Sequence, residues 1–418
     1  HPSRAMNGSI ITIGDELLIG QVVNTNQAYI AERLNDAGVA VVRMTTVGDS
    51  MSSIIEAFRE SWEAFDIVVV TGGLGPTHDD ITKKAVCTFF DSPLEKNEQL
   101  LEHIKARVEQ RKIPWLPTHE EQALFPSKGV VVPNPRGTAA GIQFDRGNRH
   151  FFVLPGVPYE MKTMIDQSVV PFLLGLGSAG RIRHRTLRTT GATESFLAAQ
   201  IGPVEEILHG ATLAFLPSPT GVRLRISVES PTAAEADRKV EAIEATLRSK
   251  IGRFVYGVDE EDLEAVIGRL LTQQGATIAV AESCTGGHIA DRLTNISGSS
   301  AYFERGVVTY SNASKVNLLG VPEDIIARDG AVSESVAIAM AEGVRRIAGT
   351  TFGVSTTGIA GPTGGSAEKP VGLVWIGFAD GNSTVAKRFQ FGDDRMLIKE
   401  RSSQAALEMI WRRVSGTM

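Results

Sequence analysis

Short apolar runs alternate with amphipathic segments along the first third of the chain. Residues 65–70 are largely apolar, which is typical of a central parallel strand that is covered on both faces. Residues 26–37 carry Ile30 and Leu34 at helical spacing. The pattern also predicts strands at 9–13 and 39–46 and a helix at 51–62. This alternation predicts a doubly wound α/β domain, in which ligands bind outside the carboxyl ends of the strands.

The hydrophobic pattern changes after a small-residue linker at 175–180. Residues 222–228 alternate between apolar and polar, as expected for a half-buried strand, and with predicted helices at 194–208 and 233–251 they form a small α+β module. The last part returns to strand and helix alternation. Its predicted strands are at 276–280, 302–310, 352–357 and 371–379, and its predicted helices are at 263–274, 286–293, 333–346 and 395–414.

The length of 418 residues is too great for one ordinary core. We therefore expect an α/β multidomain protein with domains at residues 6–173, 180–253 and 258–415. The chain is 42% hydrophobic and 22% charged, an ordinary globular balance. No apolar run approaches the roughly 18 residues of a membrane helix, so we expect no membrane partner.

Net charge and cysteine content limit the kinds of partner and the cellular compartment that fit this chain. Cys87 and Cys284 are the only cysteines and lie far apart in the sequence, so they form no disulfide framework and a cytoplasmic location fits best. The net charge of −6 argues against broad nucleic-acid binding. Arg183, Arg185 and Arg188 continue a basic stretch that starts at Arg181, but no aromatic residue alternates with them, which favours a solvated strand face over an RNA site.

The first candidate for chemistry is the run Ala281-Glu282-Ser283-Cys284-Thr285-Gly286-Gly287. It follows a predicted buried strand and opens a predicted helix, where backbone N–H groups lack helical partners and can bind an oxyanion or a phosphate. Ser283 is then a candidate nucleophile. A serine at this place also suits a helix cap, and the run alone supports both readings equally.

A serine nucleophile needs a base, and several residues compete for that role. His288 lies in the predicted helix after Ser283, but no Asp and His arrangement is evident. Lys315 follows the strand at 302–310 and can act as a base if burial lowers its pKa, although most lysines are simply on the surface. Tyr310 and Thr357 also lie at strand ends, where they can orient Ser283 or relay a proton.

A second candidate loop follows the central strand of the first domain. Gly72, Gly73 and Gly75 suit a phosphate-cradling loop, and the adjacent Asp79 and Asp80 suit a divalent cation that bridges phosphates. A tight turn with an aspartate capping the next helix is the structural alternative. Three further places follow or flank strand ends and can line the same crevice, namely Gly14-Asp15-Glu16, Asn24-Thr25-Asn26 and Asp49, although each residue taken alone suits a turn or a cap better than a ligand.

These motifs, in this order, resemble those of the CinA (competence/damage-inducible) family from Met6 to about Arg413. The matching blocks are Ile13 to Leu18, Gly20-Gln21, Asn24 to Asn26, Thr71 to Thr77 with Asp79-Asp80, Leu154 to Pro158 with Glu160-Met161, Ala281 to Gly287, Tyr310 to Asn312 with Lys315, Gly330 to Ser333, Thr357 to Pro362, and Lys369 to Gly372. The resemblance implies a molybdopterin-binding-like first domain, a KH-type middle module and a C-terminal amidase domain.

The resemblance also implies two activities. The C-terminal domain is expected to hydrolyse nicotinamide mononucleotide (NMN) to nicotinate mononucleotide and ammonia, with Ser283 as nucleophile and Lys315, Tyr310 and Thr357 as activating partners. The N-terminal domain is expected to hydrolyse ADP-ribose to AMP and ribose 5-phosphate with a divalent metal ion, magnesium or cobalt, with potassium as a further candidate. No cofactor is expected for the deamidase. The expected metal ligands are Asp79, Asp80 and Asp15, and the expected substrate- and phosphate-binding residues are Thr285, Gly286, Gly287, Gly364, Arg395, Gly14, Asn24, Asn26, Asp49, Gly72, Gly73, Gly75 and Thr77.

The chain departs from the family pattern in its middle module. It lacks the Gly-x-x-Gly loop with which KH modules clamp a nucleic-acid backbone, which favours a spacer or dimerisation role. A homodimer that binds small nucleotides is therefore expected. Two alternatives stay open: a molybdopterin-binding or adenylylating enzyme, and a non-catalytic accessory protein of competence or DNA damage.

Overall fold

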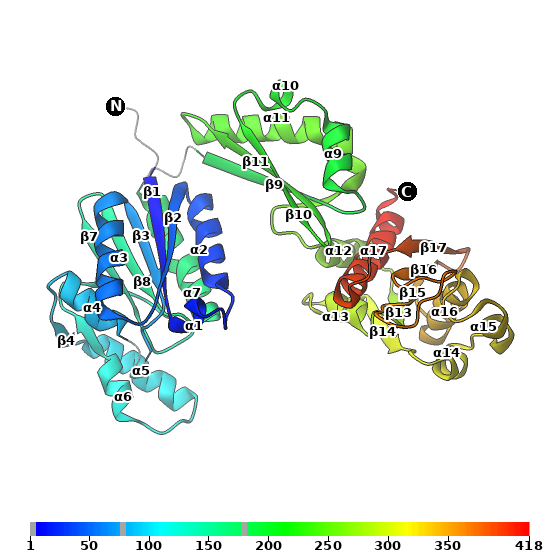
Figure 1. Ribbon diagram of the computed structural model, residues 1–418, viewed down its shortest axis with the longest axis horizontal. Helices are drawn as coiled ribbons and strands as arrows, with labels where there is room; N and C mark the ends of the chain where they lie inside the picture. The colour runs from blue at the N-terminus through cyan, green and yellow to red at the C-terminus, as the bar shows by residue number, and fades with distance from the viewer. Residues whose placement is uncertain (1–5, 76–80, 177–181, 418) are drawn as a thin grey trace. The chain divides into compact units, whose positions relative to one another are not determined.

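The computed structural model describes residues 6–75, 81–176 and 182–417, and Figure 1 shows their elements. The chain forms two compact units. One unit runs to residue 183 and includes residues 229–237, and the other contains residues 184–228 and 238 onward. None of the helices in the described ranges is both long and apolar enough to cross a membrane.

The first unit is built on a six-stranded sheet with the order β2-β1-β3-β8-β7-β6. The strands are β1 (Met6–Ile13), β2 (Val39–Val47), β3 (Ile67–Thr71), β6 (Val130–Val132), β7 (Gly141–Arg146) and β8 (Arg149–Leu154). The strands β2, β1, β3 and β8 are parallel, and β7 and β6 continue the sheet in antiparallel fashion. A second, two-stranded sheet pairs β4 (Leu94–Lys96) with β5 (Leu124–Pro126).

Helices cover both faces of the first sheet, as the strand pattern predicts. Val68 and Val70 of β3 pack into one buried cluster with α3, whereas Ile67 and Val69 face a second cluster with α2 and α7. The helices of this unit are α1 (Asp15–Leu18), α2 (Thr25–Asp36), α3 (Met51–Ala64), α4 (Thr82–Phe89), α5 (Glu98–Gln110), α6 (Pro117–Gln122), α7 (Pro158–Met164), the π-helical turn η1 (Ile165–Val169) and α8 (Val170–Gly175).

The middle module has a four-stranded sheet with the order β10-β11-β9-β12. Its strands are β9 (Ile182–Thr189), β10 (Thr212–Ser218), β11 (Gly221–Glu229) and β12 (Val255–Val258), and its helices are α9 (Glu194–Ile201), α10 (Glu205–Leu208), α11 (Ala233–Ile251) and η2 (Gly252–Phe254). The single helix predicted at 194–208 is wrong. Two shorter helices form instead, because Gly202 has a φ of 76° and Pro203 follows it, and neither residue continues a helix.

Carboxylates pair with the described arginines of the basic stretch on β9. Arg183 pairs with Asp237 at 2.7 Å, and Arg188 pairs with Asp262 at 2.8 Å. Arg185 pairs in the same way with Glu244 at 2.7 Å. The guanidinium groups of β9 are therefore engaged within the protein rather than presented as a basic face. Arg181 lies outside the described residues.

The C-terminal part is a five-stranded mixed sheet with the order β14-β13-β15-β16-β17. Its strands are β13 (Ile278–Glu282), β14 (Phe303–Val308), β15 (Phe352–Gly358), β16 (Leu373–Ala379) and β17 (Thr384–Gln390). Its helices are α12 (Leu263–Gln274), α13 (His288–Thr294), η3 (Ser299–Ala301), α14 (Asn312–Leu319), α15 (Glu323–Asp329), α16 (Glu334–Ala348) and α17 (Arg395–Ser415). One buried cluster joins α12, α13 and α17 to the sheet, and another joins α14 and α16 to it.

Parallel pairing brings three strand ends to one edge of this sheet. In the register of β13, Glu282 lies opposite Val308 of β14 and Thr356 of β15. The residues that follow Glu282 and Val308 therefore emerge side by side, at the edge where ligands of such sheets bind. This edge carries Ser283 and the segment before α14.

Candidate functional site

Ser283 and Lys315 meet at the carboxyl edge of the C-terminal sheet. Ser283 follows β13 directly, and its N–H donates to the carbonyl of Thr356 at 3.0 Å. Lys315 lies in α14, and its Nζ is 3.0 Å from the Ser283 Oγ. The same Nζ donates to the carbonyls of Thr309 at 2.8 Å and Tyr310 at 3.2 Å. Three oxygen atoms therefore fix the amine beside the serine hydroxyl.

Burial changes the chemistry of this lysine. Lys315 is only 1% exposed, and desolvation lowers its pKa from the usual value for lysine. The neighbouring Cys284 is also buried, which raises the pKa of its thiol to about 12 and keeps that thiol neutral. No carboxylate of the described chain forms an ion pair with Lys315. A neutral amine beside a serine hydroxyl is the arrangement that lets the amine act as a base.

The helix after Ser283 begins later than the sequence predicts. The sequence predicts a helix from Gly286, but Gly286 and Gly287 have φ of 64° and 99°, and α13 begins at His288. The first turn of α13 is capped by Glu282, whose carboxylate accepts from Ile289 N–H at 2.9 Å and Ala290 N–H at 3.0 Å. Glu282 therefore caps α13, which is the role that the sequence also allowed for Ser283.

The two glycines also determine which N–H groups remain for a ligand. Gly286 N–H donates to the Ser283 carbonyl at 3.1 Å, and His288 N–H donates to the Thr285 carbonyl at 3.3 Å. Gly287 N–H has no backbone partner within the described residues. Of the predicted oxyanion donors, Gly286 is therefore engaged in the turn, whereas Gly287 is available.

The other predicted partners of Ser283 point elsewhere. The Thr357 hydroxyl donates to the Ala331 carbonyl at 2.7 Å, and the Tyr310 hydroxyl accepts from Arg395 at 3.2 Å. Arg395 also donates to the Gly361 carbonyl at 2.6 Å, which ties the start of α17 to the loop after β15. Gly364 lies in that same loop with a φ of 89°. None of these side chains forms a hydrogen bond with Ser283 within the described residues.

A cavity of about 450 Å³ opens beside the Ser283 turn. The turn residues Thr285 to Gly287 line it on one side, and Met396, Lys399 and Glu400 of α17 line the other, with His288 and Asp291 from α13. Lys399 lies one helical turn after Arg395, so both cations belong to one face of α17. Lys399 and Glu282 are not predicted as site residues from the sequence. The only signal for Lys399 is its spacing from Arg395. The signal for Glu282 is a carboxylate at the end of an apolar strand.

The first unit has its own cavity, of about 430 Å³, at the carboxyl edge of its sheet. Of the predicted residues, Asn24, Asn26, Gly72, Gly73 and Gly75 line it. The predicted residues Gly14, Asp15 and Asp49 are not among its described lining. The carboxylates of Asp15 and Asp49 instead accept each other's backbone N–H at 3.0 Å. Thr77, Asp79 and Asp80 lie outside the described residues.

Packing explains the two glycines that follow β3. A Cβ on Gly72 would lie 2.2 Å from the Ile13 carbonyl oxygen, and one on Gly73 would lie 2.1 Å from Thr82 Oγ1. Both have positive φ, 112° and 66°. The backbone therefore passes close to β1 and α4 with no room for side chains, and the same lack of side chains leaves the loop open toward the cavity.

Two buried acceptors lie in the wall of this cavity without a hydrogen-bond partner among the described residues. They are Asn26 Oδ1 and Gln122 Oε1. The orientation of the Asn26 amide follows from its Nδ2, which donates to the Gly156 carbonyl at 2.7 Å. A buried acceptor without a donor is costly, so these oxygens suit a ligand that brings O–H or N–H groups.

The fit of a divalent metal to this cavity depends on oxygen donors. Glu16 and Glu160 are the carboxylates in its described lining, and Glu160 accepts from Asn134 at 2.7 Å. No group of three His, Cys, Asp or Glu side chains within the described ranges is arranged to hold a metal ion. Carboxylates and water are the ligands that magnesium prefers, so Glu16 and Glu160 are the residues of the described lining whose chemistry suits this ion.

Comparison with known proteins follows the same three-part division. Residues 9–175 match the model of a probable molybdopterin binding domain, residues 184–257 match the damage-inducible protein CinA KH domain, and residues 260–414 match the CinA C-terminal domain. The chain is thus a three-part protein with a molybdopterin-binding-like part, a CinA KH part and a CinA C-terminal part.

Relatives that match over nearly their whole length show the family to which the chain belongs. A CinA-like protein of Salinibacter ruber is 44% identical over 412 residues, which are 98% of this chain and 100% of the relative. A CinA-like protein of Chloroherpeton thalassium is 45% identical over 414 residues, 97% of this chain and 98% of the relative. The chain therefore belongs to the CinA family. Among solved structures, the competence/damage inducible protein CihA from Agrobacterium tumefaciens is 44% identical and covers 36% of this chain and 93% of its own, with a TM-score of 0.35.

Proposed function

We propose that the C-terminal domain is an amide hydrolase that converts NMN to nicotinate mononucleotide and ammonia. The observation that carries this proposal is the buried Lys315 amine 3.0 Å from the Ser283 hydroxyl, with a lowered pKa and no carboxylate partner in the described chain. A serine with a neutral lysine base performs acyl transfer and needs no histidine. The choice of a nucleotide amide as the substrate rests on the resemblance of the C-terminal motifs to the CinA family, and the match of residues 260–414 to the CinA C-terminal domain agrees with that resemblance.

In the proposed reaction, the Lys315 amine takes the Ser283 proton while the Ser283 oxygen attacks the carboxamide carbon. The carbonyl oxygen becomes an oxyanion, for which Gly287 N–H is the available donor. Lys315 then returns its proton to the leaving nitrogen, the C–N bond breaks, and ammonia departs. A water molecule, deprotonated by Lys315, attacks the acyl carbon and releases the carboxylate, and Ser283 regains its proton.

The nucleotide phosphate has a matching pair of cations. Arg395 is held by Gly361 and Tyr310, and Lys399 follows it on α17 at the wall of the cavity. Lys399 lines the cavity beside the glycine turn, and Arg395 lies one helical turn before it on α17, so these two cations suit an anionic group that a neutral amide would not require. This placement favours a phosphorylated substrate over free nicotinamide.

Replacing Ser283 with alanine tests the proposal. We expect ammonia release from NMN to fall by more than about 10³-fold, because loss of the nucleophile costs at least as much as loss of one oxyanion donor. Ser300→Ala, which changes an exposed serine of the same domain, serves as the matched control. Ammonia release by Ser283→Ala at the rate of the control would contradict the mechanism.

We propose as a second activity that the N-terminal cavity hydrolyses ADP-ribose to AMP and ribose 5-phosphate. The observation in its favour is the pairing of an open glycine loop, suited to phosphates, with the unpartnered acceptors Asn26 Oδ1 and Gln122 Oε1, suited to ribose hydroxyls. A divalent metal, held by carboxylates of the cavity such as Glu16 and Glu160, would supply Lewis-acid polarisation of the pyrophosphate.

Replacing Asn26 with leucine tests this second activity. The variant keeps the branched shape of the side chain but removes the unpartnered oxygen and the Nδ2 that donates to Gly156, and we expect kcat/KM for AMP release to fall about tenfold or more. Ammonia release from NMN by the same preparation is the internal control, because Asn26 belongs to the other compact unit. Unchanged AMP release in Asn26→Leu would overturn the assignment. Turnover of ATP with molybdopterin in place of ADP-ribose would favour the adenylylating alternative.

A further inference from the structure

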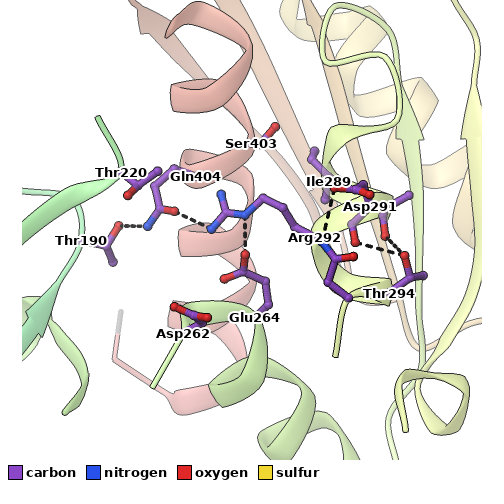
Figure 2. Close-up of polar contacts among 12 residues, drawn as sticks. Thr190, Thr220, Asp262, Glu264, Ile289, Asp291, Arg292, Thr294, Ser403 and Gln404 are labelled. Carbon is purple, nitrogen blue, oxygen red and sulfur yellow. Dashed lines mark hydrogen bonds and ion pairs between the residues drawn. The ribbon is translucent and has the colours of Figure 1, made fainter. Parts of the chain in front are cut away.

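A chain of polar side chains links the middle module to the helix that follows Ser283 (Figure 2). Thr190, which follows β9, accepts a hydrogen bond from Gln404 of α17 at 2.9 Å. The Gln404 oxygen accepts from Arg292 of α13 at 2.8 Å, and Arg292 pairs with Glu264 of α12 at 2.5 Å. The chain thus runs from the middle module through α17 to α13 without a gap.

Burial makes these contacts specific. Thr190 is fully buried and Gln404 is 7% exposed, so neither side chain has water as a ready substitute for its partner. The orientation of the Gln404 amide is determined at both ends, because its nitrogen meets a hydroxyl and its oxygen meets a guanidinium. Removing one member would leave a buried donor or acceptor unpaired, which costs more than the bond itself contributes.

The helix at the end of this chain is the one that supports the candidate active site. α13 has only seven residues and begins immediately after the glycine turn. Glu282 holds its first turn through Ile289 and Ala290, and Arg292 lies in its last turn. A helix this short has little stability of its own, so contacts at its two ends determine its position.

We infer that the middle module acts as a brace for the amide-hydrolysing site, with Thr190 as a positioning residue. Thr190 orients Gln404, Gln404 orients Arg292, and Arg292 holds the far end of α13, so that the glycine turn before α13 keeps its position after Ser283. The module contributes no group to the reacting atoms. A second contact with α17, from Arg412 to the Arg253 carbonyl at 3.2 Å, supports the same docking. The activity part of this inference rests on the proposed function.

The chain offers a matched pair of variants for the test. Thr189 and Thr190 are adjacent and buried, and both are hydrogen-bonded. The Thr189 hydroxyl donates to the Val222 carbonyl at 2.6 Å, inside the middle module, whereas Thr190 bonds to Gln404. Thr190→Val breaks the bridge, Thr189→Val breaks a bond within the module, and Thr190→Ser keeps the hydroxyl.

Hydrogen exchange of the full-length chain gives a readout that needs no catalysis. We expect amides of residues 288–294 to exchange about tenfold faster in Thr190→Val than in the wild type, with wild-type rates in Thr190→Ser and Thr189→Val. For NMN, kcat should fall severalfold in Thr190→Val with KM within about twofold, because the cations of α17 still bind the phosphate.

Each outcome decides between the brace and a simple loss of stability. Equal acceleration of exchange in Thr189→Val and Thr190→Val, or no change at residues 288–294 in Thr190→Val, would overturn the inference. If exchange responds as expected but the wild-type protein releases no ammonia from NMN, the brace stands and the proposed function fails. If ammonia is released but exchange is unaffected by Thr190→Val, the proposed function stands and the brace fails.

Discussion

Lys315 shows how position within a fold changes the role of one residue type. A lysine near the start of a helix is usually solvated and protonated. Here the side chain turns inward, is 1% exposed and meets the Thr309 and Tyr310 carbonyls as well as Ser283. Burial disfavours the charged ammonium, and this desolvation lowers the pKa of Lys315. His288, the competing base in the sequence, lines the cavity and forms no hydrogen bond with Ser283 within the described residues, whereas Lys315 does.

The lowered pKa of Lys315 leads to a prediction about pH. The amine acts as a base only when it is neutral, so kcat/KM for NMN should rise with pH along a limb below the ordinary lysine pKa of about 10.4. The unfolded chain binds more protons than the folded chain between the lowered and the ordinary pKa, so the penalty that this buried lysine imposes on folding decreases as pH rises through that window. Rate profiles from pH 6 to 10 measure the limb.

Lys315→Arg is the control for this profile, because a guanidinium does not lose its proton in this range. The variant should lose ammonia release at every pH. A limb of the same shape in Lys315→Arg would assign the titration to another group.

At the scale of elements, the glycine turn and α13 depend on Glu282. Its carboxylate is 1% exposed and both of its oxygens accept backbone N–H groups of α13. A negative charge at a helix N-terminus is favourable, and this one also satisfies donors that the helix itself cannot. The residue before the candidate nucleophile Ser283 therefore sets the direction of the helix that follows.

Glu282→Gln tests this role with almost no change in volume. One oxygen becomes an NH₂ group that faces a backbone N–H, so we expect a loss of about 1–3 kcal/mol in the free energy of unfolding of the C-terminal part and a lower kcat for NMN. Denaturant unfolding measures the first effect. Asn97→Ala removes the cap of α5 in the other unit, and it should leave NMN turnover unchanged. Wild-type stability and turnover in Glu282→Gln would contradict the role.

The hydrophobic pattern predicts long elements well and short or exposed ones poorly. The predicted bounds of α11 and α12 agree with the structure, because each has a continuous buried stripe. The strand β17 was missed because its residues are mostly exposed at the sheet edge. The meeting of Ser283 and Lys315 was foreseeable from parallel strand ends, whereas the direction of the Thr357 hydroxyl toward Ala331 depends on packing between distant segments.

At the scale of the whole molecule, two cavities of different chemistry belong to the two compact units. The N-terminal cavity offers a glycine loop, unpartnered acceptors and the carboxylates Glu16 and Glu160, a set that suits phosphates with a hard cation. The C-terminal site offers an amine, a hydroxyl and backbone N–H groups. Both oxygens of the neighbouring Glu282 carboxylate accept hydrogen bonds from backbone N–H groups of α13. The two proposed reactions therefore need different conditions.

Removing divalent metal should separate the two activities in one preparation. After treatment with EDTA, we expect AMP release from ADP-ribose to be lost, because a bound cation would supply the Lewis-acid polarisation on which the proposed reaction depends. Ammonia release from NMN should be unchanged, because the lysine base and the N–H donors of the Ser283 turn work without metal. Adding magnesium or cobalt should restore AMP release alone, and Ser283→Ala should show the reverse pattern, with AMP release and no ammonia. Parallel loss of both activities on chelation would contradict this division of chemistry between the two cavities.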